Sequence, residues 1–447
     1  MTSVASVIRT KQQQYEATIA DFLAQENGHI IILSDDQPFL TLLRRLMLKQ
    51  FNSGNAMTIV ANVAQLVRVV KNRAKANPGM LVFMERFMDG RTHDEFVRRF
   101  KEEHPTLRII ILTNDVERDQ LMLLHEIGAD NFVTKPVSVN TLVEKIAFTL
   151  KPQSKLGQLI DTAKAHLARN EPQAALELSR QILDAKPNSA AGYLVRGDAH
   201  RLLGDLETAQ ESYEKASEYA ELFMDPLRRL GDLHGAMGNS ESRLKYLERM
   251  DQISPLNAER KVDMGAVHLD LGRSEAAQKL FDVAVAITRE DVSRVTNRIG
   301  TLCMDKDPLM AEKYLRRSLE AKGKDLSRED LKTFNQLGIN LRQQGRWQDA
   351  LTEYEKALRI APDDENLYYN MGMAKAEGRN FTEAQADMVK ALEINPDLPT
   401  AGSGIACNIG LVFMQAGAGK EAARYLRMAL DRDPGCEAAR AALSRLH

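Results

Sequence analysis

Several side chains that could bind charged ligands follow strand-like segments in the first third of the chain. Asp35 and Asp36 come directly after the apolar run IIILS, and Glu85 directly follows another, MLVFM. Thr113 and Lys135 come after two later runs. Carboxylates are hard oxygen ligands suited to Mg²⁺, whereas an ammonium group with a hydroxyl suits the oxygens of a phosphate. These residue types indicate a site for small charged ligands, provided that the fold brings the strand ends together.

The elements that would position these side chains alternate between strand and helix patterns. The expected strands cover 30–34, 57–61, 80–84, 108–112 and 131–133. The expected helices cover 38–51, 62–75, 92–103, 117–127 and 139–150. Such alternation predicts a parallel sheet with both faces covered, in a doubly wound, flavodoxin-like α/β domain over 28–150. Ligands bind such domains at the carboxyl ends of the strands, where the polar residues collect.

This constellation resembles the receiver domain of two-component response regulators. The segment GADNFVTKP, which contains the lysine, is close to the usual sequence of that family. The resemblance implies that Asp35 and Asp36 hold Mg²⁺. It also implies that Thr113 and Lys135 bind the oxygens of a transferred phosphoryl group, and that Phe132 is the aromatic switch residue.

The sequence departs from the family at the residue that accepts the phosphoryl group. Glu85 stands where an Asp belongs, and the loop before Asp89 is shorter than usual. One extra carbon moves the carboxylate by roughly 1.5 Å, and a misplacement of about 1 Å can cost on the order of 100-fold in rate. We therefore predict a degenerate receiver in which Lys135 neutralises Glu85. The alternatives are that Glu85 is still modified, that Asp89 replaces it, or that the charged residues only hold the strand ends.

A second pattern begins after the α/β segment. Residues 331–364 form two short amphipathic helices, with Gly338 and Ala350 where they approach and Pro362 after the second. The spacing resembles the tetratricopeptide repeat, a 34-residue helix–turn–helix unit. Small residues equivalent to Gly338 recur at Ala163, Gly197, Gly231, Gly265, Gly300, Gly372 and Gly410. We expect eight repeats over 156–435, stacked as an α-solenoid, and a capping helix over 436–447.

The resemblance implies that the concave face of the solenoid binds protein ligands. Its lining is expected from fixed positions of the first helix of each repeat. These positions hold Arg201, Arg228, Asp232, Lys332, Asn335, Arg342 and Tyr369. Mixed charge with amides and an aromatic ring suits an extended peptide or a partner helix. The alternative is an ordinary solvated face.

Four histidines also recur at the repeat spacing. His166, His200, His234 and His268 lie 34 residues apart. This regularity raises the hypothesis of a metal or proton-relay site. Neighbouring helices lie about 8–10 Å apart, however, whereas zinc requires ligands within about 2 Å. We therefore interpret the histidines as packing residues, with pH-sensitive packing as the alternative.

The N-terminal segment 1–27 is expected to be a helical extension. Within it, 11–25 carries Tyr15, Ile19 and Phe22 at helical spacing, which makes one apolar stripe. Such a stripe indicates packing on the rest of the chain, or alternatively a docking or dimer contact.

Composition excludes several classes of protein. A net charge of −2 and a pI near 6.5 give no electrostatic footprint for nucleic acid or an anionic membrane. Cys303, Cys407 and Cys436 are far apart and odd in number, which suits a reducing compartment better than a disulfide framework. There is no signal-peptide core and no apolar run of membrane-spanning length. The expectation is a soluble, cytoplasmic protein.

No grouping of catalytic residues emerges, so the chain is not expected to be an enzyme. We predict a non-catalytic signalling adaptor of a two-component type pathway, which binds proteins through the degenerate receiver and the repeat groove. The resemblance places receiver contacts near 121–127 and 139–148, with a histidine kinase or another response regulator as partner. One alternative is a phosphorylation-responsive regulator whose receiver still switches the repeats. Another is a constitutive scaffold for an envelope or motility machine.

Overall fold

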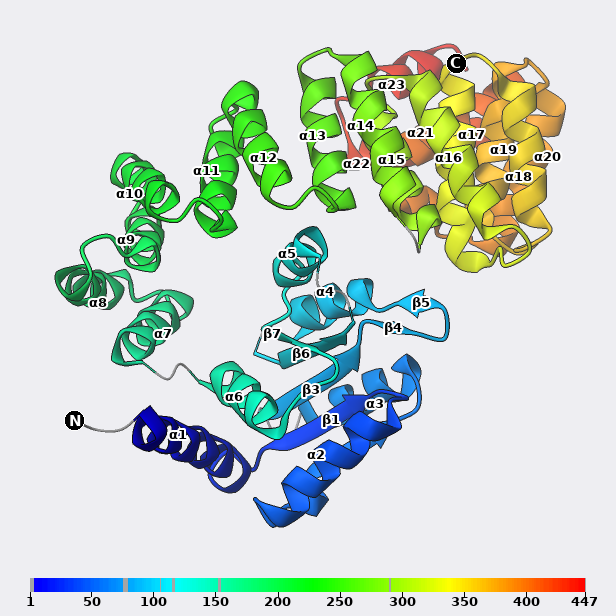
Figure 1. The fold of residues 1–447 in the computed structure, drawn as a ribbon. Coiled ribbons are helices and arrows are strands. Elements are labelled where there is room, and N and C mark those ends of the chain that lie inside the picture. Colours follow the sequence, from blue (N-terminus) through cyan, green and yellow to red (C-terminus); the bar gives the residue numbers. More distant parts are fainter. Residues whose placement is uncertain are drawn as a thin grey trace. The chain divides into compact units, whose positions relative to one another are not determined.

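The computed structural model describes residues 4–74, 79–104, 106–114, 117–151, 154–288 and 291–446. These residues form two compact units, Met1–Arg260 and Lys261–His447, which we describe separately. Figure 1 shows a sheet flanked by helices near the N-terminus and only helices after it. The predicted fold class, an α/β domain followed by a helical solenoid, is confirmed.

The sheet of the first unit has five parallel strands in the order β2-β1-β3-β6-β7. The strands are β1 (His29–Leu33), β2 (Met57–Val60), β3 (Met80–Glu85), β6 (Arg108–Thr113) and β7 (Asn131–Thr134). The residues of β1 and β3 are buried throughout. Central strands of a parallel sheet are covered on both faces, which explains their unbroken apolar runs.

Six helices cover the two faces of this sheet. They are α1 (Val4–Ala24), α2 (Gln37–Lys49), α3 (Val63–Ala74), α4 (Asp94–Glu103), α5 (Arg118–Glu126) and α6 (Val139–Leu150). One apolar core joins α1, α2 and α6 to alternate strand residues such as Ile30 and Ile32. The other joins α3, α4 and α5 to the residues between them, such as Ile31 and Leu33. The period-2 alternation of strand side chains thus divides the domain into two cores.

The N-terminal helix α1 packs on its own domain. Ile19 and Phe22 are almost wholly buried in the core shared with α2 and α6, and the Tyr15 ring lies 5.5 Å from that of Phe148. The apolar stripe therefore serves internal packing. The helix begins at Val4, earlier than residue 11, where it was expected.

A short hairpin after β3 was not expected from the sequence. Strands β4 (Phe87–Met88) and β5 (Arg91–Thr92) pair antiparallel. Asp89 and Gly90 both have positive φ, 54° and 76°, which matches an Asp-Gly turn of type I′. The shortened connection between β3 and α4 thus forms this hairpin. Helix α4 begins at Asp94, two residues later than expected.

The rest of the chain is a helical array. In the first unit it contains α7 (Lys155–Ala168), α8 (Pro172–Ala185), α9 (Ala190–Leu202), α10 (Leu206–Tyr219), α11 (Met224–Ala236) and α12 (Ser240–Ile253). Helix α13 (Ala258–Asp270) begins at the end of this unit. The second unit continues with α14 (Ser274–Ile287), α15 (Val292–Cys303), α16 (Pro308–Lys322), α17 (Leu331–Gln343), α18 (Trp347–Leu358), α19 (Glu365–Glu377), α20 (Phe381–Ile394), α21 (Ser403–Gln415), α22 (Gly419–Arg432) and α23 (Glu437–Ser444). The link expected at 151–155 includes residues 152–153, which lie outside the described residues.

Small residues let the paired helices approach, as the repeat pattern predicts. A Cβ atom on Gly338 would lie 2.2 Å from the ring of Tyr354, which is fully buried. The repeat containing Gly231 differs, because a Cβ atom there would meet nothing closer than 3.9 Å. The close glycine–aromatic contact is therefore not uniform along the array.

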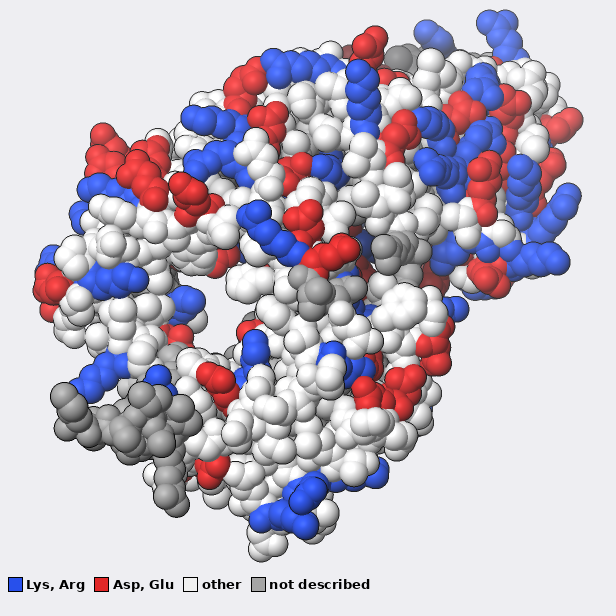
Figure 2. Space-filling view, in the orientation of Figure 1, with Lys and Arg blue, Asp and Glu red and all other residues white. Residues whose placement is uncertain are grey.

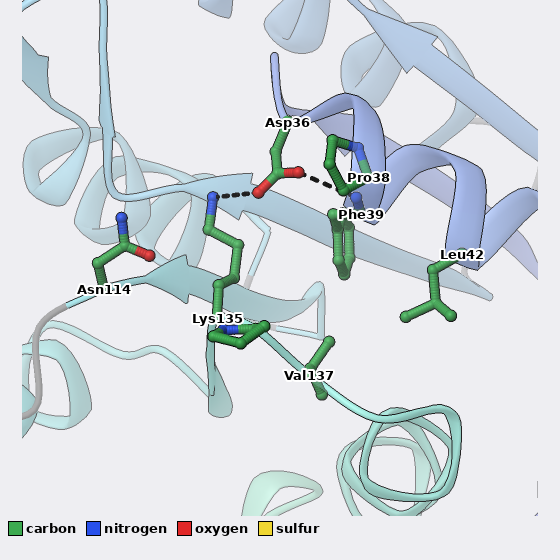
Figure 3. A pocket seen from close by; sticks show the side chains of 8 residues that line it. Asp36, Pro38, Phe39, Leu42, Asn114, Lys135 and Val137 are labelled. Atoms are coloured by element: carbon green, nitrogen blue, oxygen red, sulfur yellow. Dashed lines mark hydrogen bonds and ion pairs between the residues drawn. The ribbon is translucent and has the colours of Figure 1, made fainter.

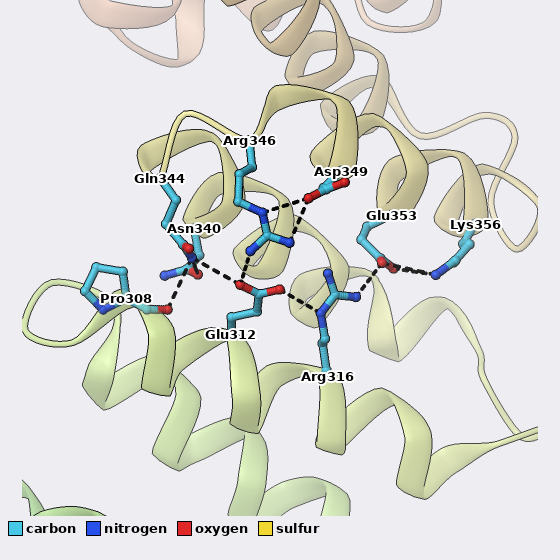
Figure 4. Close-up of polar contacts among 9 residues, drawn as sticks. All are labelled: Pro308, Glu312, Arg316, Asn340, Gln344, Arg346, Asp349, Glu353 and Lys356. Atoms are coloured by element: carbon cyan, nitrogen blue, oxygen red, sulfur yellow. Dashed lines mark hydrogen bonds and ion pairs between the residues drawn. The ribbon is translucent and has the colours of Figure 1, made fainter. Parts of the chain in front are cut away.

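Charged side chains link second helices of neighbouring repeats in the second unit (Figure 4). Arg316 donates to Glu312 on its own helix and to Glu353 on α18, at 2.9 and 2.7 Å. Arg346 joins Glu312 to Asp349, and Lys356 also binds Glu353. The carboxylate of Glu353 is 6% exposed, so this network compensates a buried charge.

Figure 2 shows acidic and basic side chains interspersed on the visible face, with no large area of one sign. The face seen in Figure 2 therefore offers no single-signed surface of the kind that attracts polyanions. Within the described ranges, no helix combines the length and apolar character needed to cross a membrane.

Candidate functional site

The strand ends of the α/β domain bring an ammonium group between two carboxylates. Lys135 Nζ lies 3.0 and 3.1 Å from the two carboxylate oxygens of Glu85. It also lies 2.9 Å from Oδ2 of Asp36. The side chains of Glu85 and Lys135 are only 5% and 14% exposed. We call Glu85, Lys135 and Asp36 the charge cluster.

Local structure fixes the two acidic members of the charge cluster. Asp36 is the N-cap of α2, and its carboxylate accepts a hydrogen bond from the Phe39 N–H at 2.9 Å. Ser34 Oγ donates to Glu85 Oε1 at 2.6 Å and accepts from the Asp36 N–H at 3.1 Å. The oxygens of both carboxylates are therefore held by hydrogen bonds from defined donors.

The contacts within the charge cluster shift the pKa values of Asp36 and Lys135. Burial by itself raises the pKa of Asp36, but hydrogen bonds from Lys135 and from the Phe39 N–H outweigh burial, and the pKa lies below its usual value. Burial by itself lowers the pKa of Lys135, but its bonds to Asp36 and Glu85 raise the pKa above the usual value. Both shifts favour the charged forms, so Lys135 remains a cation next to the Asp36 carboxylate at neutral pH.

The arrangement does not fit a Mg²⁺ ion as it stands. The Lys135 ammonium group occupies the place between the carboxylates of Glu85 and Asp36, and Asp35 is exposed. In the part of the chain that the structure describes, no three His, Cys, Asp or Glu side chains are grouped to hold a metal. Hard cations require several free oxygen ligands, and hydrogen bonds already engage the carboxylate oxygens of Glu85 and Asp36.

The expected switch residues lie beside the charge cluster. Thr113 ends β6, is 4% exposed, and its carbonyl accepts from the Lys135 N–H at 3.2 Å. The Phe132 ring is half-buried against the core of α3, α4 and α5, and Lys145 Nζ lies 4.6 Å from its centroid. The structure thus places Thr113 next to Lys135 at the end of β6, whereas Phe132 lies within β7, three residues before Lys135.

Sequence reasoning missed the side chains that fix the segment after Glu85. Arg86, 7% exposed, makes a bidentate pair with Asp94 at 3.2 and 3.1 Å and also donates to Gln120. The His93 Nδ1 lies 2.7 Å from the Glu85 carbonyl oxygen. A charged residue directly after an apolar strand was the available signal for Arg86. Its partner comes from another element, which spacing alone does not reveal.

A pocket of about 460 Å³ opens beside the charge cluster (Figure 3). Its polar end is formed by Asp36, Lys135 and Asn114. Its remaining wall is formed by Pro38, Phe39, Leu42, Pro136 and Val137. The pocket therefore combines a charged end with an apolar wall, a combination that suits an amphipathic group of a ligand or partner.

The two expected partner surfaces of the α/β domain differ. On α5, Glu126 pairs with Arg260, whose side chain is 3% exposed, and Met122 packs against the core of α9 to α12 within the same unit. Part of the 121–127 surface is thus covered by the chain itself, which was not expected from the sequence, while His125 is exposed. On α6, Val139 and Phe148 are 39% and 48% exposed.

In the second unit, polar side chains connect the first helices of successive repeats. We call this row the first-helix ladder; it consists of Asn297, Thr301, Thr333, Gln336, Asn335, Asn370, Arg342, Glu377, Tyr369 and Asn408. Asn370 donates to Asn335 at 3.1 Å, and Asn408 donates to the Tyr369 hydroxyl at 2.8 Å. Each bond spans one repeat, so the ladder runs along α15, α17, α19 and α21.

Three of the seven expected groove residues belong to this ladder. They are Asn335, Tyr369 and Arg342, which pairs with Glu377 at 2.6 Å. The structure places three others on exposed positions, namely Arg201, Asp232 and Lys332. Arg228 is half-buried and pairs with Asp225 at 3.3 Å. Asn370, Asn408 and Glu377 were missed, although they recur one repeat after residues that were named.

An apolar pocket of about 220 Å³ adjoins the ladder. It is lined by Met373, Ala376, Glu377, Phe381, Asn408, Leu411, Val412 and Gln415. Its residues come from α19, α21 and the start of α20. A ladder of amides beside an apolar pocket can hydrogen-bond a peptide backbone while holding one apolar side chain.

The four regularly spaced histidines do not gather. His166 and His200 hydrogen-bond acidic residues of the following turn, at 2.5 Å to Glu171 and 3.1 Å to Asp205. His234 stacks on Tyr246, with ring centroids 5.5 Å apart. These contacts agree with local packing and capping roles.

Comparison with known proteins agrees with this arrangement. The family model of the response regulator receiver domain matches residues 30–147. Family models of the tetratricopeptide repeat match 160–221, 338–377 and 365–398.

Among curated proteins, the chain is similar to the photosynthetic apparatus regulatory protein RegA of Rhodobacter capsulatus, with 30% identity over 118 residues. RegA of Rhodovulum sulfidophilum is 27% identical over 116 residues. Each alignment covers 26% of this chain, and the chain spans 60% and 59% of the length of these relatives.

Solved structures of repeat proteins are also similar to this chain. One is a tetratricopeptide repeat protein from Parabacteroides merdae, at 15% identity and a TM-score of 0.35, covering 65% of this chain and 98% of that one. Another is the C-terminal part of a repeat-containing protein from Cytophaga hutchinsonii, at 16% identity and a TM-score of 0.39, covering 64% and 99%. With the strand order, the buried cluster at the strand ends and the family models taken together, the chain carries a response regulator receiver domain followed by tetratricopeptide repeats.

Proposed function

We propose that this protein is a non-catalytic signalling adaptor, in which an unphosphorylated receiver and a repeat array each bind proteins. The observation that carries this proposal is the position of Lys135, whose ammonium group bonds both oxygens of Glu85 and one oxygen of Asp36. Glu85 stands at the phosphoacceptor position of the receiver. Its carboxylate is already neutralised, so it is a poor nucleophile toward a phosphodonor.

The burial of the Glu85 carboxylate also argues against its phosphorylation. The Glu85 side chain is 5% exposed, and Ser34 also donates to one of its oxygens at 2.6 Å. A phosphodonor would have to displace two donors and reach a buried atom before any bond could form. In-line transfer depends on placing the reacting atoms within about 3–3.5 Å, and the burial of Glu85 with its bound donors opposes such an approach.

In this proposal, Lys135 takes the role of the metal ion. An ammonium group between Glu85 and Asp36 supplies a positive charge where Mg²⁺ would otherwise balance two carboxylates. Thr113, whose carbonyl accepts from the Lys135 N–H, and Phe132, three residues before Lys135, are then held in one state by a permanent ion pair. The receiver serves as a fixed binding platform, and the pocket between α2 and the segment after β7 offers its contact surface.

The repeat array provides the second binding surface. The first-helix ladder and its adjoining pocket suit an extended segment with one apolar side chain, contributed by a protein partner. The receiver class and the similarity to regulatory proteins support a two-component type pathway. A histidine kinase or another response regulator is the partner class that we propose for the receiver. The three free cysteines suit a reducing compartment, and we propose the cytoplasm.

The decisive experiment tests phosphorylation at Glu85. The full chain is incubated with Mg²⁺ and a small phosphodonor such as acetyl phosphate, and intact mass and hydroxylamine trapping of acyl-phosphates are measured. We expect no adduct on the natural chain. A phosphate that is trapped on the natural chain and lost in Glu85→Gln would establish the phosphorylation-responsive alternative.

Two variants sharpen that experiment. Asp89→Asn tests whether the hairpin carboxylate replaces Glu85, because any adduct on Asp89 would disappear in it. Glu85→Asp shortens the acceptor and withdraws it from Lys135. If Glu85→Asp is phosphorylated, the longer side chain is what blocks the site; if it stays unmodified, the altered loop after β3 blocks it.

Partner binding through the repeats is tested by charge reversal at groove positions that the structure exposes. Arg201→Glu together with Lys332→Glu should reduce recovery of the main partner at least tenfold in pull-downs from the native cell. Lys279→Glu on the second helix α14 is the matched control and should leave recovery unchanged. Equal recovery with all three proteins would move the binding site to the receiver or to the second helices.

A further inference from the structure

Two of the three cysteines lie together at the C-terminal end of the array. Cys407 belongs to α21, and Cys436 is the residue directly before α23. Both belong to one apolar cluster of α21, α22 and α23, in which the side chain of Cys436 lies close enough to act on the Cys407 thiol. They are far apart in the sequence, so this proximity is a product of the fold.

The helix that Cys436 precedes covers the last helix pair. Ala439 and Ala442 of α23 are buried in the cluster that contains Cys407, and Leu443 and Leu446 pack against it. The helix has only eight residues. An isolated helix of that length is unstable in water, so α23 depends on its packing.

The two thiols differ in exposure. Cys407 is 4% exposed, whereas Cys436 is partly exposed. Cys303, the remaining cysteine, is wholly buried in α15. An oxidant from solvent therefore meets Cys436 first, Cys407 lies next to it as the resolving thiol, and Cys303 serves as an internal control.

We propose that Cys407 and Cys436 form a reversible disulfide that fastens α23 to the last repeat. The oxidant is a small-molecule disulfide, such as glutathione disulfide. The Cys436 thiolate attacks one sulfur of the oxidant, the S–S bond of the oxidant breaks, and one glutathione thiolate leaves. Cys407 then gives its proton to solvent and attacks the Cys436 sulfur, which releases the second glutathione thiolate. Two cysteine thiols are oxidised, and one glutathione disulfide is reduced to two thiols.

Burial, followed by the interaction with the adjacent Cys436 side chain, raises the pKa of Cys407 to about 11. The thiolate that carries out the second step is therefore scarce at neutral pH. We expect the closure of the disulfide to become faster as pH rises, after the mixed disulfide has formed. This pH dependence separates the proposed order of steps from a route in which Cys407 reacts first.

The test uses the full chain, reduced, desalted and then incubated with glutathione disulfide over a range of reduced glutathione. After alkylation, intact mass and peptide mapping are measured on the natural chain and on three single variants, Cys407→Ser, Cys436→Ser and Cys303→Ser. The natural chain and Cys303→Ser should lose about 2 Da and two alkylatable thiols. Cys407→Ser should stop at one glutathione adduct on Cys436, and Cys436→Ser should react many-fold more slowly.

A second measurement tests the fastening of α23. Limited proteolysis within α23 should be several-fold slower for the oxidised natural chain than for the reduced chain, and unchanged by oxidant in Cys407→Ser. Three results would overturn the proposal. These are adducts without loss of mass in the natural chain, a disulfide-linked dimer on a non-reducing gel, and a cross-link that leaves cleavage of α23 unchanged.

Discussion

The interactions of the receiver are concentrated in one buried cluster, whereas those of the repeat array are distributed over successive repeats. In the receiver, one buried cluster of Glu85, Lys135 and Asp36 gathers side chains from the ends of three strands or the loops that follow them. In the array, a close contact between a glycine and an aromatic ring recurs in several repeats. The repeat that contains Gly231 lacks this contact. A single substitution should therefore affect the receiver as a whole, whereas in the array its effect should remain within one repeat and its neighbours.

The largest effect is expected when the charge cluster loses its cation. Lys135→Met leaves Glu85 buried without its ion pair, and the receiver should lose about 3–5 kcal/mol of stability. Urea unfolding followed with a receiver-specific probe measures this loss. Lys313→Met is the control in the array, because that lysine pairs with Asp282 at 3.1 Å on an exposed position and should cost less than about 1 kcal/mol. Equal losses would break the comparison.

Replacing a repeat glycine by alanine should change the stability of the array by an intermediate amount. Whether the change destabilises the array depends on the repeat. Gly338→Ala places a methyl group 2.2 Å from the Tyr354 ring and should cost about 1–3 kcal/mol. Gly231→Ala is the matched change in a repeat with room for the methyl group. It should be neutral or should stabilise its helix by up to about 1 kcal/mol. Calorimetry on both variants checks this, and destabilisation by Gly231→Ala would contradict it.

The smallest effect concerns pH and is confined to the receiver. His29 is buried in β1, where its Nε2 lies 2.8 Å from the Thr58 hydroxyl, and burial followed by the charge of Arg73 lowers its pKa to about 4. The folded state keeps His29 neutral, whereas the unfolded state binds a proton below about pH 6.5. Stability should therefore fall as pH drops from 6.5 toward 4, by about 1–2 kcal/mol at pH 5.

The control for that pH effect is His29→Gln, which keeps a hydrogen-bonding group toward Thr58 but does not titrate. Its receiver should show a smaller decrease in melting temperature between pH 7 and pH 5. Asp36 and Lys135 should not contribute to this slope. The lowered pKa of Asp36 and the raised pKa of Lys135 place their contributions below about pH 4 and above about pH 10. An identical slope in His29→Gln would assign the acid sensitivity to other groups.

Much of the fold could be predicted from the sequence because periodic burial determines it. The strands and helices of the receiver lie within a few residues of their expected bounds, and the repeat glycines anticipate the helix pairs. The hairpin at 87–92 was missed, since two-residue strands are too short to show alternation. Only Asp89-Gly90 signalled its turn.

The candidate site was predicted less completely, for a different reason. Residue types identified Glu85 and Lys135, and their pairing is as expected. Ser34 was missed because no sequence pattern indicates that a serine before two acidic residues will bind a distant carboxylate. The contact of Glu126 with Arg260 was missed because local periodicity carries no information about contacts between segments that are far apart in sequence.

The first-helix ladder has a mechanical consequence. Asn335 accepts a hydrogen bond from Asn370, and Tyr369 accepts one from Asn408, so each rung links one repeat to the next. A ligand that takes over the hydrogen bond of one rung would therefore weaken the link between those two repeats only, and the other rungs would keep their bonds.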